Sequence, residues 1–99
     1  MVVVLSEMAR SPTYNGSDGR DHWPCTSAMV IGSGVAGGRM YGAWDEEMYG
    51  RQTDLASGDA SDSGEWLAPE HLGATLLALA DVDPADAGVL VDPIAGMLA

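Results

Sequence analysis

The residues best suited to chemistry stand in one short run. Arg20, Asp21 and His22 are consecutive, and Trp23 and Pro24 follow them. Neutral imidazole and carboxylate are good ligands for Zn, Mn or Fe, so Asp21 and His22 are candidate metal ligands that need partners from elsewhere in the fold. Arg20 is a candidate clamp for an oxyanion, because its guanidinium presents a fork of donors. The alternative, which the pattern alone favours, is a structural network of loop amides, carbonyls and a packed indole.

Glu7 and Arg10 form a second group, directly after the apolar run of residues 2–5. Ligands of open α/β sheets bind beyond the carboxyl ends of strands, so this position favours a role in a site. The alternative is an ion pair between Glu7 and Arg10 that holds the shape of the loop.

Two weaker signals lie further along the chain. Residues 32–37 match G-x-G-x-x-G after a strand-like run, but Gly38 and Gly42 interrupt the helix that dinucleotide binding requires. A glycine turn between two strands is the favoured interpretation. Cys25, the only cysteine, lies three residues after His22 without an evident third group to orient a thiolate–imidazole pair, so it is expected to be a small buried residue.

The charge of the chain is distributed unevenly. Fifteen acidic side chains face four arginines, for a net charge of −11 over 99 residues. Residues 1–40 are neutral overall, so the excess acid lies in residues 41–99. Four scattered arginines make no basic patch, which argues against nucleic acid and against an anionic membrane surface. No apolar stretch is long enough to span a membrane.

The elements that must position these residues are few. Residues 2–5 and 28–31 read as strands, and the first has the unbroken apolar pattern of a strand covered on both faces in a parallel sheet. Residues 39–44 suggest a third strand. Residues 69–80 are the clearest helix, with Pro at its first position and leucines at helical spacing. Ala68 is a poor N-cap for this helix, and His71 is expected on its surface.

These elements suggest one incomplete domain over residues 1–99. Residues 1–44 hold the strands and the site loop, residues 45–65 are an acidic surface excursion, and residues 66–99 hold the helix and the C-terminal tail. A chain that opens on a core-type strand suggests the end of something longer. The expected fold class is therefore α/β, with few strands and one main helix.

The motifs in this order resemble the C-terminal end of the bacterial domain of unknown function 1501 family. Members are often labelled sulfatase-like and are grouped with the alkaline phosphatase-like superfamily. Ser-Glu-x-x-Arg-x-Pro and Gly-Arg-Asp-His-Trp together are fairly specific. The matching segments are residues 2–12, 19–24, 37–39, 42–45, 67–72 and 81–84.

The resemblance implies roles for individual residues. In related hydrolases the strand that ends near Glu7 delivers an Asp-His pair to metal, and Glu7-Met8 stands here in its place. Glu7 is thereby implied as a metal ligand or orienting carboxylate, alongside Asp21 and His22. Arg10, in Ala-Arg-Ser-Pro where the family usually has Gly-Arg-Thr-Pro, is implied with Arg20 as a catalytic contact to the oxyanion.

The resemblance also implies a larger protein. Family members are several times longer, many carry an export signal, and the superfamily nucleophile lies in the preceding region, which is the expected partner of this chain. The favoured hypothesis is a C-terminal part of an alkaline phosphatase-like sheet, in a periplasmic or exported protein that hydrolyses small sulfate or phosphate esters with a divalent metal. The alternatives are a non-catalytic exported scaffold or binding protein of the same fold and, more weakly, a nucleotide-binding fragment.

Overall fold

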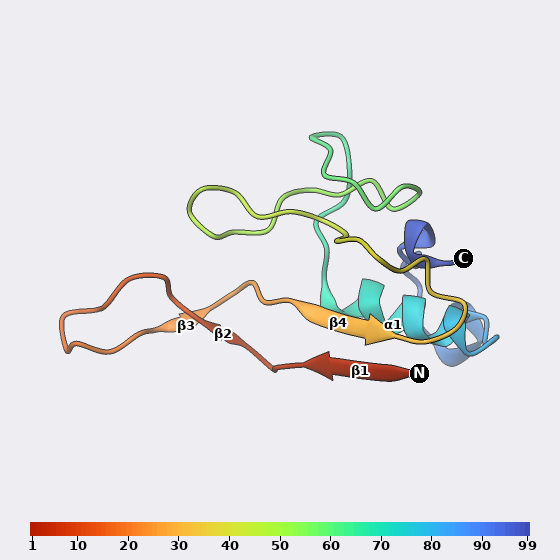
Figure 1. The fold of residues 1–99 in the computed structure, drawn as a ribbon, viewed down its shortest axis with the longest axis horizontal. Helices are drawn as coiled ribbons and strands as arrows, with labels where there is room; N and C mark the ends of the chain where they lie inside the picture. Colours follow the sequence, from red (N-terminus) through yellow and green to blue (C-terminus); the bar gives the residue numbers. More distant parts are fainter.

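The computed structural model describes all 99 residues and contains few regular elements. The segment between β4 and α1 has no regular strand or helix and forms turns and loops (Figure 1). No helix is long and apolar enough to cross a bilayer. The elements in chain order are β1 (Val2–Leu5), β2 (Ala9–Arg10), β3 (His22–Trp23), β4 (Ala28–Ile31), α1 (Pro69–Leu79) and two 3-10 helices, η1 (Pro84–Ala87) and η2 (Ala95–Met97).

The strands form two separate antiparallel sheets of two strands each. β1 pairs with β4 from Val2↔Ile31 to Leu5↔Ala28, and β2 pairs with β3. Both apolar runs predicted as strands are strands over the predicted residues. They pair with each other in opposite directions because the β2–β3 hairpin between them turns the chain back. The structure is therefore mixed α and β, with two hairpin sheets where a larger parallel sheet was expected.

The helix prediction is confirmed to within one residue, since α1 spans Pro69–Leu79. Ala68 makes no side-chain cap, as predicted. The prediction that His71 lies on the surface is wrong: His71 is buried, and its Nδ1 accepts a hydrogen bond from the Ala68 N–H at 3.0 Å. The imidazole folds back over the first turn and supplies an acceptor where the N-terminal amides lack one.

Replacing His71 by Ala tests this cap. We expect the free energy of unfolding to fall by about 1–2 kcal/mol in urea titrations, because an amide at the helix start loses its acceptor. His71→Gln is the matched control, since a Gln at this third helical position also reaches back to the N-cap amide. Equal losses in the two variants would mean that burial of the imidazole, rather than the cap, provides the stabilisation.

The glycines of residues 32–42 form turns, and two expectations fail there. The third strand predicted over residues 39–44 is wrong, because Gly38 and Gly42 have φ of +80° and +74°, a left-handed conformation that breaks an extended run. The nucleotide-binding hypothesis is also wrong. No helix begins at residues 32–37, so no helix N-terminus is present to receive a pyrophosphate.

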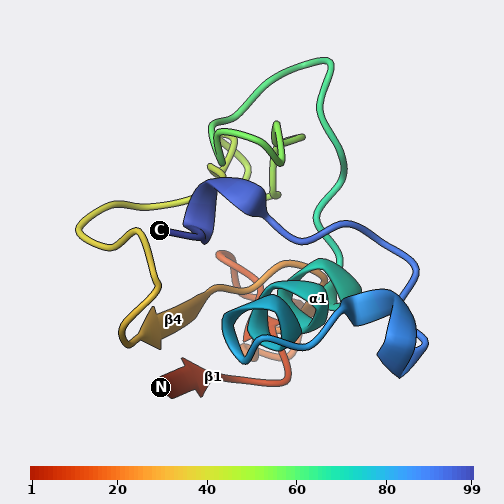
Figure 2. The same ribbon diagram turned by 90° about the vertical axis from the view of Figure 1, so that its right-hand side faces the viewer.

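The small core forms where the C-terminal segment crosses α1. Its buried apolar side chains are Ala74, Ile94 and Met97. The Oγ1 atom of the fully buried Thr75 accepts a hydrogen bond from the Ile94 N–H at 2.9 Å and donates one to the His71 carbonyl at 2.7 Å. This segment runs above α1 and returns beside the loop of residues 41–67, which we call the acidic loop (Figure 2). It therefore joins the helix to the acidic loop.

The β1–β4 sheet is covered on one face only. In Figure 2 α1 lies beside one face, and the opposite face carries no helix. Side chains on this bare face are apolar and more than half exposed: Val2, Val4, Met29 and Ile31. The chain exposes 6594 Å² in total. A compact monomer of its 10.3 kDa mass exposes about 5,400 Å², so about 1,200 Å² of surface is in excess.

Candidate functional site

The short β2–β3 hairpin positions the run of chemical residues found in the sequence. Arg10 pairs across the hairpin with His22, and Ala9 pairs with Trp23. Beyond the strands, the Ser11 N–H donates to the Asp21 carbonyl at 2.8 Å, and the buried Ser11 hydroxyl accepts from the Asp21 N–H at 3.0 Å. Ser11 therefore holds the two ends of the loop of residues 12–20 together.

Asn15 organises that loop. Its Oδ1 accepts hydrogen bonds from the Ser17 N–H at 2.9 Å and the Gly19 N–H at 3.0 Å, and its Nδ2 donates to Asp21 Oδ1 at 3.0 Å. The Asp21 carboxylate thus takes part in a structural network of the kind named as the alternative to metal binding. His22 lies exposed on β3.

A tight turn at residues 45–49 faces the hairpin. Asp45 Oδ1 accepts hydrogen bonds from the Glu47 and Tyr49 amides, both at 2.9 Å, which is the local pattern that makes aspartate favourable in turns. Trp44 and Gly50 form an antiparallel bridge at its base. The turn therefore holds Trp44 at a defined place beside β3.

Three contacts fix this turn against β3 and against Cys25, two residues after the strand. The indole Nε1 of Trp23 donates to the Met48 carbonyl at 2.7 Å. The ring of Trp23 lies against that of Tyr49, with centroids 4.6 Å apart. The Gly50 N–H donates to Cys25 Sγ at 3.3 Å, and Cys25 is half-buried, where the sequence predicted a buried residue.

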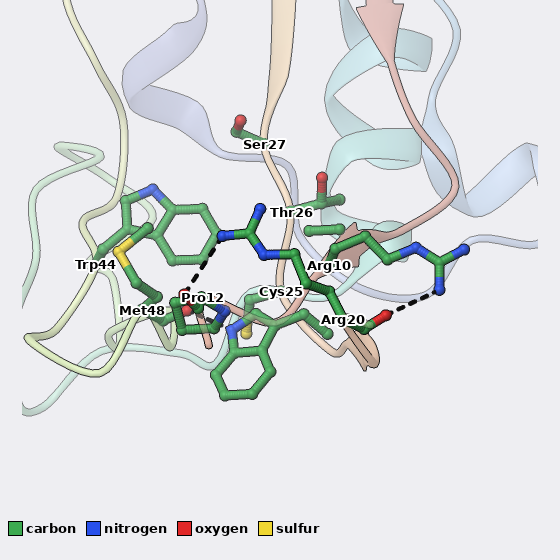
Figure 3. A pocket seen from close by; sticks show the side chains of 10 residues that line it. Arg10, Pro12, Arg20, Cys25, Thr26, Ser27, Trp44 and Met48 are labelled. Carbon is green, nitrogen blue, oxygen red and sulfur yellow. Dashed lines mark hydrogen bonds between the residues drawn. The ribbon is translucent and has the colours of Figure 1, made fainter. Parts of the chain in front are cut away.

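An open cavity of about 330 Å³ lies between the hairpin and the turn (Figure 3). Two of the four arginines line it, and none of the fifteen acidic residues does. In a chain with a net charge of −11 this local composition is distinctive. The lining residues are Ala9, Arg10, Pro12, Arg20, Trp23, Cys25, Thr26, Ser27, Trp44 and Met48.

The arginines divide into two kinds. Arg39 and Arg51 form ion pairs, with Asp59 at 2.5 Å and Asp62 at 3.5 Å. Arg10 and Arg20 form none, so the ion pair expected as the alternative role of Arg10 and Glu7 is not formed. The two arginines that line the cavity therefore carry positive charge that no carboxylate neutralises directly.

Both cavity arginines are held through backbone carbonyls. Arg10 Nη1 donates to the Arg20 carbonyl, and Arg20 Nη2 donates to the Pro12 carbonyl, each at 3.3 Å. Figure 3 shows the two guanidinium groups pointing apart, with that of Arg20 toward Trp44 and that of Arg10 to the other side. The Arg20 guanidinium also lies over the Tyr14 ring, 5.6 Å from its centroid.

The structure brings together only part of the predicted site. Arg10 and Arg20 share the cavity, whereas Glu7, Asp21 and His22 are not among its lining residues. Glu7 Oε2 accepts a 3.4 Å hydrogen bond from the neighbouring Ser6 hydroxyl. No three His, Cys, Asp or Glu side chains of the chain gather as a metal-binding group, so these candidate ligands do not form a cluster with one another.

Sequence reasoning missed the second wall of the cavity. Trp44 and Met48 come from a turn about twenty residues after β3, and no periodic pattern links the two segments. The one usable signal was Asp45, whose turn-forming chemistry marks a tight reversal next to a tryptophan.

The fold and the cavity define a small mixed α and β chain with an arginine-lined pocket. A family model described as "Protein of unknown function (DUF1501)" matches residues 1–86. The chain belongs to this family, which confirms the resemblance drawn from its motifs. No curated protein and no solved structure matches it.

Proposed function

We propose that the cavity binds the oxyanion of a small sulfate or phosphate ester, within an exported protein that hydrolyses such esters. The observation that carries this proposal is that two arginines, Arg10 and Arg20, line one cavity whose wall contains no acidic residue. An anion entering there meets positive charge that no carboxylate neutralises directly, and hydrogen bonds between a guanidinium group and an anion are charge-assisted and therefore strong.

The two arginines have different parts in the proposal. The Arg20 guanidinium, which points toward the Trp44 side of the cavity in Figure 3, makes the direct contact to the oxyanion. Arg10 holds the backbone of Arg20 through its carbonyl and adds a second positive charge to the cavity. A residue that holds another in place has a smaller but measurable effect, so Arg10 is a positioning residue first and an anion contact second.

A divalent metal belongs to the proposal through the family resemblance, with Glu7, Asp21 and His22 as its candidate ligands. Carboxylate and imidazole suit Zn, Mn or Fe. These three side chains do not form a cluster within the chain, so we assign them no step in a reaction. When bound, such a metal polarises the ester and activates the nucleophile.

The proposal also includes a polypeptide partner, the preceding α/β region that the family resemblance implies. Two observations support it: the bare apolar face of the β1–β4 sheet, and about 1,200 Å² of surface beyond that of a compact monomer. A standard protein interface buries about 800 Å² on each partner, so the excess is enough for one. Further strands beside β1 and an apolar layer over Val2 and Val4 would extend the hairpin into an alkaline phosphatase-like sheet.

Anion titration tests the proposed pocket in the chain itself. We expect inorganic sulfate or phosphate to shift backbone amide resonances of residues 9–27 and 44–48 in ¹H–¹⁵N spectra. Arg20→Gln should weaken this binding by roughly 10-fold or more, the range of a charge-assisted hydrogen bond. Arg51→Gln, outside the cavity and also at the surface, is the matched control and should leave binding unchanged. Equal weakening in both variants would reveal a general charge effect and reject the pocket.

A non-catalytic binding protein of the same fold is the second candidate, because the three predicted metal ligands do not gather into a metal-binding group. Alanine at Glu7 and His22 in a protein that includes the preceding region distinguishes the two. Ester hydrolysis and bound metal that are both lost in the variants support the hydrolase, whereas a protein that hydrolyses no ester before substitution and still binds the anion after it favours the binding protein.

A further inference from the structure

We infer that Asn15 is a positioning residue that keeps the cavity positively charged, because it holds the Asp21 carboxylate away from the two cavity arginines. The inference rests on the proposed oxyanion site and adds a residue that controls the affinity of that site for anions. It is carried by the hydrogen bonds around Asp21, which is adjacent to Arg20 in the chain and yet does not line the cavity.

The backbone of Asp21 is fixed, so only its side chain is free to turn. Its N–H donates to the Ser11 hydroxyl at 3.0 Å, and its carbonyl accepts from the Ser11 N–H at 2.8 Å. Asp21 is exposed, so packing does not hold its side chain. The carboxylate accepts one hydrogen bond, from Asn15 Nδ2 at 3.0 Å, and it forms no ion pair. Asn15 alone therefore sets where this carboxylate lies.

A charged partner for the Asp21 carboxylate lies close to its backbone. Arg10 Nη1 donates to the Arg20 carbonyl at 3.3 Å, and that carbonyl belongs to the peptide bond between Arg20 and Asp21 (Figure 3). If Asn15 released the carboxylate, we expect a change of the Asp21 rotamer to bring it to the Arg10 guanidinium. Such an ion pair would place a negative charge at the cavity and oppose the binding of an anion.

Asn15 is itself held firmly before it donates to Asp21. Its Oδ1 accepts from the Ser17 and Gly19 amides at 2.9 and 3.0 Å, and its own N–H donates to the Gly19 carbonyl at 2.7 Å. Because these bonds already order the side chain, its bond to the carboxylate costs little further entropy. The amide is also neutral, so it holds Asp21 without adding a charge to the hairpin.

Asn15→Ser tests the inference by titration with inorganic phosphate in buffer that contains a chelator. The serine hydroxyl also accepts from nearby amides in turns, but this side chain is too short to reach Asp21. We expect phosphate to bind roughly 2- to 5-fold more weakly, the range that exposed ion pairs provide. The side-chain N–H resonances of Arg10 should shift in this variant before any phosphate is added, because the released carboxylate pairs with the guanidinium. Amide spectra establish that the variant is folded.

Two double variants separate the effect of charge from that of loop shape. Asn15→Ser with Asp21→Asn removes the released carboxylate and should recover phosphate binding. Asn15→Ser with Asp18→Asn has the same net charge and removes an acid of the same loop, so it is the matched control and should stay weak. Asparagine is tolerated at residue 18, because φ of +57° there is the left-handed conformation that Asn adopts readily.

The outcomes of these titrations are distinguishable. Equal phosphate binding by Asn15→Ser and the unchanged chain, with dependence on Arg20, overturns the inference and leaves the oxyanion site standing. The same holds if both double variants stay weak, which assigns the loss to loop shape, or if both recover, which assigns it to net charge. Absence of phosphate binding by the unchanged chain overturns the oxyanion site and the inference with it.

Discussion

Gly96→Ala is expected to lower the free energy of unfolding by about 3 kcal/mol or more, the upper range for overpacking. A Cβ atom at Gly96 would clash with the carbonyl carbon and oxygen of Ser57, which are backbone atoms and cannot rotate away. The Gly96 N–H also donates to the Leu55 carbonyl at 3.0 Å, so the two segments cannot separate without losing that bond. The substitution should detach the C-terminal segment from the acidic loop.

Gly73→Ala is the matched control for this prediction. Gly73 lies inside α1, and a Cβ there meets nothing within 4 Å. Alanine should therefore raise stability by roughly 0.5–1 kcal/mol through its higher helix propensity. Urea titrations of the two variants measure both changes. Similar stability of Gly96→Ala and the unchanged protein would contradict the close backbone approach at residues 57 and 96.

Thr75→Val is expected to cost about 2–3 kcal/mol although the two side chains have nearly the same shape. Thr75 is fully buried, and its hydroxyl is the hydrogen-bond acceptor for the Ile94 N–H. Valine leaves that buried amide without a partner, and an unsatisfied buried group costs about 1–3 kcal/mol. The His71 carbonyl also loses the hydrogen bond that the Thr75 hydroxyl donates to it.

Thr75→Ser separates the hydrogen bond from the packing. Serine keeps the hydroxyl and loses one methyl group, so we expect a cost of about 1 kcal/mol. Hydrogen exchange at the Ile94 amide provides a local readout, since protection should fall in the valine variant and persist in the serine variant. A serine variant as unstable as the valine variant would assign the effect to packing.

Local sequence signals predicted the helix and the two longer strands, but not the two-residue strands β2 and β3. The helix at Pro69–Leu79 follows from a proline start and leucine spacing, and the strand at Val2–Leu5 from an unbroken apolar run. These signals are local, because they depend on residues within one or two turns of each other. The failures are tertiary: the imidazole of His71 is buried because it caps its own helix, and Gly38 and Gly42 turn the chain where alternation suggested a strand.

The candidate site was predicted in part for the same reason. Arg10 and Arg20 were predicted as anion contacts from their residue type and their motifs; both line the cavity, and their contact with an anion stays a prediction. Trp44 and Met48 were missed because their contact with the hairpin depends on a turn distant in sequence. The grouping of Glu7, Asp21 and His22 likewise depends on geometry that neither residue type nor spacing specifies.

The uneven charge leads us to expect that salt speeds the approach of an anion to the cavity. At 0.01 M salt the screening length is about 30 Å, comparable with the 47 × 28 × 26 Å dimensions of the chain, so an approaching anion is repelled by the whole net charge of −11. At 0.15 M the length is about 8 Å, and only the charges nearest the cavity act on the anion. The association rate constant of an anionic ester should therefore increase from dilute buffer to physiological salt, the reverse of ordinary electrostatic steering.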